Sequence, residues 1–134
     1  MIAIACVDDG LGVGFNRRRQ SRDRAMLARL GAVTGGAPVW MNAATAKLFD
    51  PLPPFVRVAE DFLDRAGQGE YCFAEDTDLA PLADRLEGLV LYRWNRTYPA
   101  DRWLGLDPGT WRLAGRTEFP GTSHEKLTEE VNTR

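Results

Sequence analysis

The stretch Ile2-Ala3-Ile4-Ala5-Cys6-Val7 is apolar throughout and ends at Asp8-Asp9-Gly10. A strand with one solvated face alternates apolar and polar residues, whereas a strand covered on both faces is apolar along its whole length. The stretch therefore predicts a central strand with other elements packed on both of its faces. Such strands are typical of α/β folds, in which helices cover the sheet.

The rest of the chain alternates predicted helices with predicted strands. Met26, Leu27 and Leu30 have helical spacing, so we expect a helix that begins after a Ser21 cap and ends at Gly31. Further strands are expected at 38–41, 56–58, 71–74 and 86–94. Short helical segments are expected at 43–49, after an Asn42 cap, and at 60–66 and 79–82.

Two alternating segments, 111–119 and 126–132, predict a closing antiparallel pair. The order of elements predicts an α/β fold, a mixed sheet flanked by short helices. At 134 residues the chain fits one domain spanning residues 1–134.

Composition narrows the class of protein. The net charge of −2 argues against a nucleic-acid partner that is bound through a broadly basic face. Cys6 and Cys72 lie in apolar runs, which favours reduced thiols and a cytoplasmic protein. No apolar run approaches the ~20 residues that span a bilayer, so we expect no membrane association.

A local concentration of charge follows the first strand, Asn16-Arg17-Arg18-Arg19-Gln20-Ser21-Arg22-Asp23-Arg24. Cations at a helix N-terminus oppose the helix dipole, and an anionic ligand would relieve this. Guanidinium groups suit phosphate and carboxylate, so we predict a ligand held by Arg17, Arg18, Arg19 and Arg22. The glycines of Gly10-Leu11-Gly12-Val13-Gly14 would let that ligand approach the backbone. The alternative is a solvated arginine face, with Asp23 pairing Arg19 or Arg24.

Several segments, in their order, resemble dihydrofolate reductase in a shortened and altered form. They are Ile4–Asp8 followed by Gly12–Asn16, Asp23 with Leu27, Gly36–Met41 with Thr45, Ala83–Leu86, the strand to Trp94, Pro99–Asp101 and Leu106–Leu113. The resemblance implies that Asp23 is the substrate-binding carboxylate, a candidate catalytic residue that would bind a pterin-like or amidine-like N–H pair. The alternative is an acid in the first turn of the helix, offsetting the dipole.

Other candidate ligand-binding residues follow strands. Arg93 and Asn95 are expected at the mouth of the same cleft, because ligands of open α/β sheets gather outside the carboxyl ends of strands. The alternative for them is an ordinary sheet surface. Asn42, after the second strand, stands where the family has a cofactor-binding Gly-Arg pair.

The sequence differs from the family's pattern at positions that bind the family's cofactor. Asn42-Ala43 replaces the Gly-Arg pair, and Ala74-Glu75 replaces a Gly-Gly pair that lets the dinucleotide approach. The segment between Phe49 and Tyr71 is expected to be too short for both the strand and the helix of the adenosine pocket. We therefore predict no NADPH site of the family kind, although a rebuilt site leaves NADPH open.

Short, arginine-rich relatives of this kind are labelled ribonuclease Z. A two-zinc nuclease needs clustered histidines and aspartates, and this chain has one histidine, His124. We therefore reject that activity, expect no metal site, and expect His124 to be solvated or to cap a strand.

Four functions remain open, in this order. The first is binding of a small anionic or heterocyclic ligand beside the arginines and Asp23. An enzyme of unidentified reaction in the same cleft, and an NADPH-dependent reductase with a rebuilt cofactor site, come next. The last is an interaction module whose arginine loop contacts RNA or an acidic protein.

Overall fold

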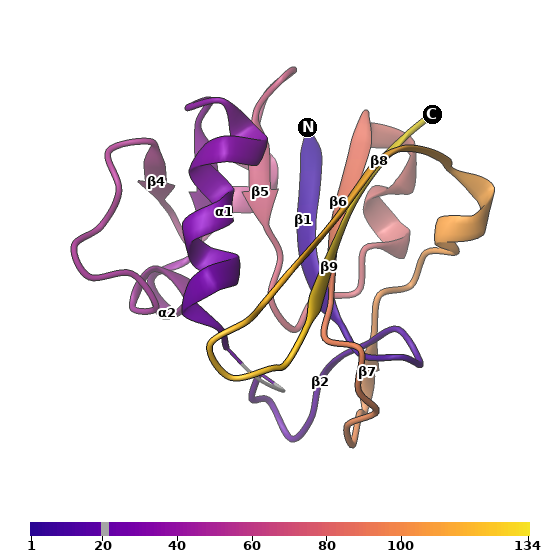
Figure 1. Cartoon of the computed structure of the whole chain (residues 1–134). Helices are drawn as coiled ribbons and strands as arrows, with labels where there is room; N and C mark the ends of the chain where they lie inside the picture. The colour runs from indigo at the N-terminus through magenta and orange to yellow at the C-terminus, as the bar shows by residue number, and fades with distance from the viewer. Residues whose placement is uncertain (20–21) are drawn as a thin grey trace.

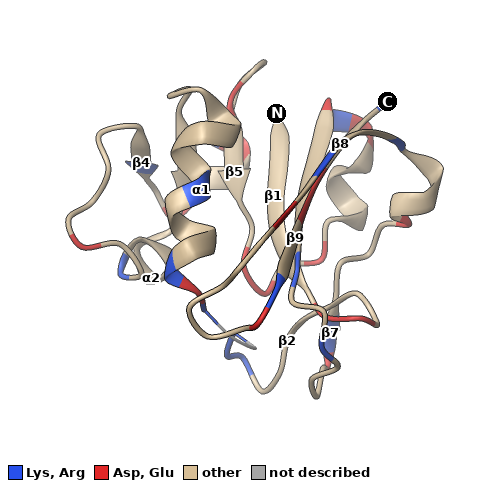
Figure 2. Ribbon diagram, in the orientation of Figure 1, with Lys and Arg blue, Asp and Glu red and all other residues tan. Residues whose placement is uncertain are grey.

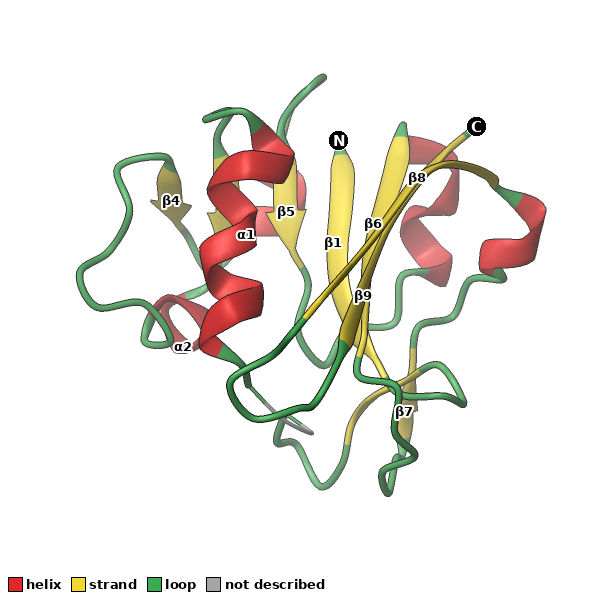
Figure 3. Cartoon of the chain, in the orientation of Figure 1, coloured by secondary structure: helices red, strands yellow, loops and turns green. Residues whose placement is uncertain are grey.

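The computed structural model describes residues 1–19 and 22–134, and a seven-stranded mixed sheet forms its centre (Figures 1 and 3). In sheet order the strands are β4 (Val56–Val58), β3 (Val39–Met41), β5 (Tyr71–Phe73), β1 (Ile2–Val7), β6 (Gly88–Arg93), β9 (Leu127–Thr133) and β8 (Arg112–Phe119). The pairs from β4 to β6 are parallel, and β9 and β8 close the sheet with antiparallel pairs. The predicted mixed α/β sheet is confirmed.

The helices are short, as expected. They are α1 (Arg24–Thr34), α2 (Ala43–Ala46), α3 (Phe62–Arg65) and the 3-10 turns η1 (Ala80–Arg85) and η2 (Pro108–Thr110). The segment after Phe49 holds β4 and α3, the strand and the helix expected there, although the predicted bounds of the helix, 60–66, were wrong. Both fit because they are reduced to three and four residues.

The predicted bounds of the first helix were also wrong. Asp23 is the N-cap of α1, because its side chain accepts hydrogen bonds from the first-turn N–H groups. Ser21, the expected cap, lies outside the described residues. The helix passes through Gly31 and ends at Gly35, whose φ of 62° lies in the left-handed region that suits a C-cap glycine.

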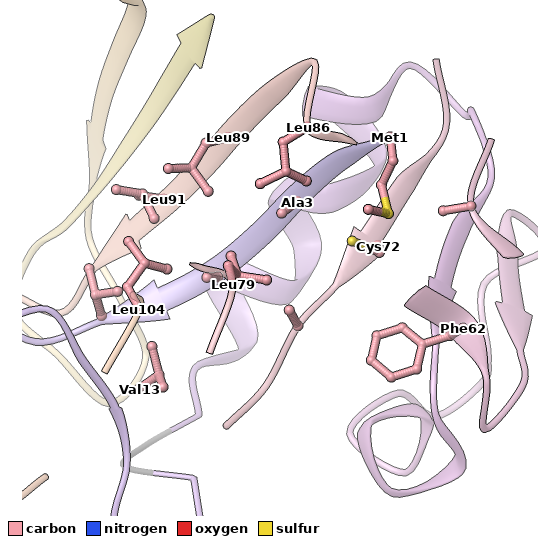
Figure 4. Packing of buried hydrophobic residues seen from close by; sticks show 14 residues of the cluster. Met1, Ala3, Val13, Phe62, Cys72, Leu79, Leu86, Leu89, Leu91 and Leu104 are labelled. Carbon is pink, nitrogen blue, oxygen red and sulfur yellow. The ribbon is translucent and has the colours of Figure 1, made fainter. Parts of the chain in front are cut away.

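The central strand separates two hydrophobic clusters. Ala3, Ala5 and Val7 pack into one of them, together with leucines from β6 and η1 (Figure 4). Ile4, between them in sequence, packs into the other cluster under α1. Successive strand residues point to opposite faces, so the apolar run at 2–7 is explained by burial on both sides.

A two-stranded ribbon, unforeseen from the sequence, lies at the carboxyl edge of the main sheet (Figure 1). It pairs β2 (Gly12–Gly14) with β7 (Arg102–Trp103). Beyond β2 the chain turns in a tight hairpin, in which the N–H groups of Phe15 and Arg18 each donate to the other's carbonyl. Its tip residues have positive φ, 54° for Asn16 and 60° for Arg17, as a two-residue hairpin turn requires.

The glycines at 10–14 therefore serve the fold. The space beside Gly14 is filled by the carboxylate of Asp76, which a Cβ at that position would meet.

None of the helices in the described residues is long and apolar enough to cross a membrane. Cys6 and Cys72 are free thiols.

Candidate functional site

A cleft of about 790 Å³ opens beside the N-terminus of α1. Three segments line it: residues 22–28 at the start of α1, residues 47–53 after α2, and residues 122–123 in the β8–β9 hairpin. The three meet because the start of α1 and the turn between β8 and β9 lie at the same edge of the sheet (Figure 1). Ligands of open α/β sheets gather at such an edge.

The cleft combines an apolar wall with a cationic rim. Its apolar residues are Leu27, Ala28, Leu48, Phe49, Pro51 and Pro53. Asp50 adds one exposed carboxylate to the lining, and Arg22, Arg24 and Lys47 supply three exposed cations. Within the described part of the chain no ion pair involves these three side chains. Basic positions accordingly gather at the lower end of α1 and beside α2 (Figure 2).

Asp23 lies in the wall of the cleft but is almost fully buried, with 1% of its surface exposed. Oδ1 accepts the N–H groups of Ala25 and Met26 at 2.8 and 3.3 Å, and Oδ2 accepts the N–H and hydroxyl of Ser123 at 2.8 and 3.0 Å. Burial works against the charged form, but these hydrogen bonds outweigh it and hold the pKa of Asp23 well below its usual range. The carboxylate is therefore ionised at neutral pH and its acceptor sites are used within the chain.

His124 has a different environment from the one expected. It is 5% exposed, so the prediction of a solvated histidine was wrong. Its ring stacks on Trp94, with centroids 4.7 Å apart, and its two nitrogens contact the hydroxyls of Ser123 and Tyr98 at 2.8 and 2.7 Å. The stacking and these hydrogen bonds stabilise the ring in the interior. Sequence reasoning missed this cluster because its members come from two separate segments, 94–98 and 123–124.

The predicted arginine ligands do not face one cavity. Arg22 lines the cleft, whereas Arg17 and Arg18 lie beside the hairpin tip, around two other hollows. Arg19 donates to the carboxylate of Glu75 at 2.8 and 3.1 Å. The alternative pairing of Asp23 with Arg19 or Arg24 is not found among the described ion pairs.

Arg19 and Arg22 also line an inner slot at the carboxyl ends of β1, β5 and β6. Its volume is about 10 Å³, the space of a single water at most. Cys6 lies in this slot, where burial, with smaller contributions from Glu75 and Asp23, raises the pKa of its thiol. The thiol is therefore protonated at neutral pH and a poor nucleophile.

Three other candidate residues lie outside the linings of these hollows. Arg93 pairs with Glu130 at 2.5 Å. The Asn95 amide donates to the Lys126 carbonyl at 3.1 Å. Asn42 caps α2, accepting the N–H of Thr45 at 2.9 Å. Their role in ligand binding stays a prediction.

The positions that the resemblance links to cofactor phosphates carry acidic partners. Glu75 follows β5 and is held by Arg19 and by the hydroxyl of Thr45, 2.9 Å away. At the start of α2, the N–H of Ala43 donates to Glu60 at 3.0 Å. Both acidic side chains thus accept hydrogen bonds from donors at these positions. Among residues 1–19 and 22–134, no three His, Cys, Asp or Glu side chains form a group that could hold a metal ion.

Comparison with known proteins establishes the fold. No family model matches the sequence, and no curated protein matches it. The structure is similar to that of dihydrofolate reductase from Enterococcus faecalis, complexed with NADP(H) and RAB-propyl, with a TM-score of 0.67 over 99% of this chain and 95% of that chain. The sequences are 14% identical, so the likeness shows the fold alone. The predicted dihydrofolate reductase-like fold is confirmed.

Proposed function

We propose that this chain binds a small organic anion, with an apolar or aromatic body and a phosphate or carboxylate group, in the cleft beside α1. The observation that carries the proposal is the meeting of an apolar wall with three cations around one cavity of about 790 Å³, the cations having no ion-pair partner among the described residues. That volume lies within the range of small-molecule sites, about 300–1,000 Å³. The body of the ligand would lie against Leu27, Leu48 and Phe49, with its charge toward the rim.

The environment of Asp23 argues against recognition of a pterin through this carboxylate. A carboxylate that recognises an N–H pair must present free lone pairs, and the four donors on Asp23 already occupy its acceptor sites. A ligand N–H pair would have to displace Ser123, which also carries part of the cleft wall. Asp23 is thus a structural carboxylate in this proposal.

An NADPH-dependent reductase is the second candidate, favoured by the likeness to a reductase solved with NADP(H). Glu75 and Glu60 argue against the family's mode of cofactor binding, because both lie at the expected phosphate positions. A reductase would need to rebuild that site.

The test uses 1-naphthyl phosphate, which combines an aromatic body with a phosphate, titrated by isothermal calorimetry. Arg22→Ala and Lys47→Ala should each weaken binding about ten- to hundredfold, because charge-assisted hydrogen bonds contribute about 1.5–3 kcal/mol. Arg112→Ala is the matched control, since Arg112 is exposed on β8, outside the cleft. Equal affinity of all four proteins, or no binding by the wild type, would contradict the proposal.

Two further probes separate the parts of the site. Inorganic phosphate should compete with 1-naphthyl phosphate weakly, since it reaches the rim but leaves the apolar wall uncovered. Uncharged 1-naphthol should bind weakly and should be insensitive to Arg22→Ala. If 1-naphthol bound as tightly as its phosphate, the cationic rim would have no part in recognition.

A further inference from the structure

Four side chains form a continuous series of hydrogen bonds between the ribbon side of the molecule and the cleft. Tyr98 contacts Nε2 of His124 at 2.7 Å, and Nδ1 of the same ring contacts the hydroxyl of Ser123 at 2.8 Å. That hydroxyl lies 3.0 Å from Oδ2 of Asp23 and 2.8 Å from the carbonyl oxygen of Arg22. Three separate segments are joined in this way.

The number of hydrogens fixes the direction of the series. A serine hydroxyl has one hydrogen, and both the Asp23 carboxylate and the Arg22 carbonyl can only accept. The ionised carboxylate is the stronger acceptor of the two, so the Ser123 hydrogen goes to Asp23, and toward His124 the hydroxyl oxygen accepts. Nδ1 then carries a hydrogen, which leaves Nε2 of the neutral ring as an acceptor. Tyr98 is consequently the donor at the far end.

The opposite direction, in which Ser123 donates to Nδ1 of His124, would be electrostatically unfavourable. If Nδ1 accepted the serine hydrogen, Ser123 would face Oδ2 of Asp23 and the carbonyl of Arg22 with lone pairs alone. The carboxylate is ionised, so this contact would be repulsive. The structure thus favours one tautomer of His124 without any contribution from a ligand.

We propose that His124 is the positioning residue of the cleft, acting through a directed chain of hydrogen bonds from Tyr98 to Asp23. The residue at its end, Ser123, lines the cleft together with Thr122, whose hydroxyl accepts the N–H of Arg24 at 3.0 Å. The loop is held close: a Cβ on Gly121 would lie 2.5 Å from Oδ2 of Asp23. His124 therefore fixes one wall of the cleft against the start of α1.

The ring itself gives the first test, because His124 is the one histidine in the sequence. Nitrogen-15 NMR of its side chain should show Nδ1 protonated and Nε2 unprotonated in the neutral ring. Tyr98→Phe removes the donor to Nε2 but should leave Nδ1 protonated, because Ser123 and Asp23 set the tautomer. Tyr71→Phe is the control, since the Tyr71 hydroxyl donates to the Val33 carbonyl, outside this series of hydrogen bonds. A wild-type ring protonated at Nε2, or a ring that changes tautomer in Tyr98→Phe, would overturn the proposal.

The second test concerns the cleft and rests on the proposed function. Tyr98 does not line the cleft, yet Tyr98→Phe should weaken 1-naphthyl phosphate binding about two- to tenfold, the range given by one net hydrogen bond. Tyr71→Phe should leave the affinity unchanged. Unchanged affinity in Tyr98→Phe would overturn the positioning role.

Two variants of the ring separate positioning from packing. His124→Phe keeps a ring on Trp94 but removes both nitrogens, whereas His124→Asn keeps a donor near Ser123. His124→Asn should bind 1-naphthyl phosphate more tightly than His124→Phe. The reverse order of affinities would contradict a role for the hydrogen bonds of His124. Failure of the wild type to bind this probe would refute the proposed function alone, since the tautomer measurement uses no ligand.

Discussion

Replacing Asp23 by Asn tests the structural role of this carboxylate most sharply. Asn is as good an N-cap as Asp, so the hydrogen bonds from Ala25 and Met26 to Oδ1 survive the change. The hydrogen bonds that are lost are those at Oδ2, which accepts both the N–H and the hydroxyl of Ser123. In the variant an NH₂ group faces these two donors.

The expected change in the free energy of unfolding depends on whether each of the two Ser123 donors can find another acceptor. The Ser123 hydroxyl can turn to the Arg22 carbonyl, 2.8 Å away, but the Ser123 N–H is left without an acceptor. An unsatisfied, partly buried donor costs about 1–3 kcal/mol of unfolding free energy. If the side-chain amide of the variant rotates by 180°, the Ser123 N–H regains an acceptor, but the N–H groups of Ala25 and Met26 lose theirs. Asp23→Asn should therefore lower stability by about 1–3 kcal/mol at pH 7.

The same variant has a distinctive pH dependence. The pKa of Asp23 in the folded protein is depressed below its unfolded value of about 3.9. Its contribution to stability is therefore complete above about pH 4–5, and is lost as pH falls through the folded pKa. The difference between wild type and Asp23→Asn should be constant from pH 7 to about pH 5 and should shrink below about pH 4.

Urea denaturation followed by circular dichroism at pH 7, 5 and 3 measures this difference. Asp107→Asn is the matched control, because Asp107 caps the exposed η2 through one oxygen, which accepts the N–H of Gly109 at 2.9 Å. It should change stability by less than about 0.5 kcal/mol. If Asp23→Asn cost no more than Asp107→Asn, or if its cost grew on acidification, the reasoning would be refuted.

Four further outcomes are expected. Gly121→Ala should cost about 1–3 kcal/mol in urea denaturation, because its Cβ would meet a carboxylate oxygen at 2.5 Å, whereas Gly115→Ala, with nothing within 4 Å, should be close to neutral; equal costs would be inconsistent with the loop packing. Arg19→Ala should destabilise the fold by about 1 kcal/mol through the loss of the Glu75 pair, and Arg18→Ala should not, which denaturation also measures. Millimolar NADPH should leave the thermal midpoint unchanged, and a rise of several degrees would instead support the reductase. Single-stranded RNA should bind weakly in fluorescence anisotropy, and tight binding that falls steeply with salt would instead support an interaction module.

Much of the fold could be predicted because the relevant signals are local. The apolar run at 2–7 indicates burial on both faces, and the alternation at 111–119 and 126–132 indicates an antiparallel pair. The ribbon of β2 and β7 could not be predicted in the same way. Each of its strands is only two or three residues long, and their pairing joins segments about ninety residues apart.

The candidate site was predictable only in part, because it too is formed by segments that lie far apart in the sequence. The arginine run reaches the cleft through Arg22, but its arginines separate because the chain turns at Asn16 and Arg17. Lys47 gives no signal in sequence, because a lone lysine after a short helix is ordinary. The His124 cluster depends on a contact to α1 from a hairpin about a hundred residues away.

The central claim is that the cleft beside α1 binds small organic anions. Titration of the nitrogen-15-labelled chain with 1-naphthyl phosphate, followed by amide chemical shifts, tests it most directly. The largest saturable shifts should fall on residues 22–28, 47–53 and 122–123, which line the cleft. Shifts confined to the hairpin at 15–18 or to the ribbon, or no saturable shift at all, would contradict the claim.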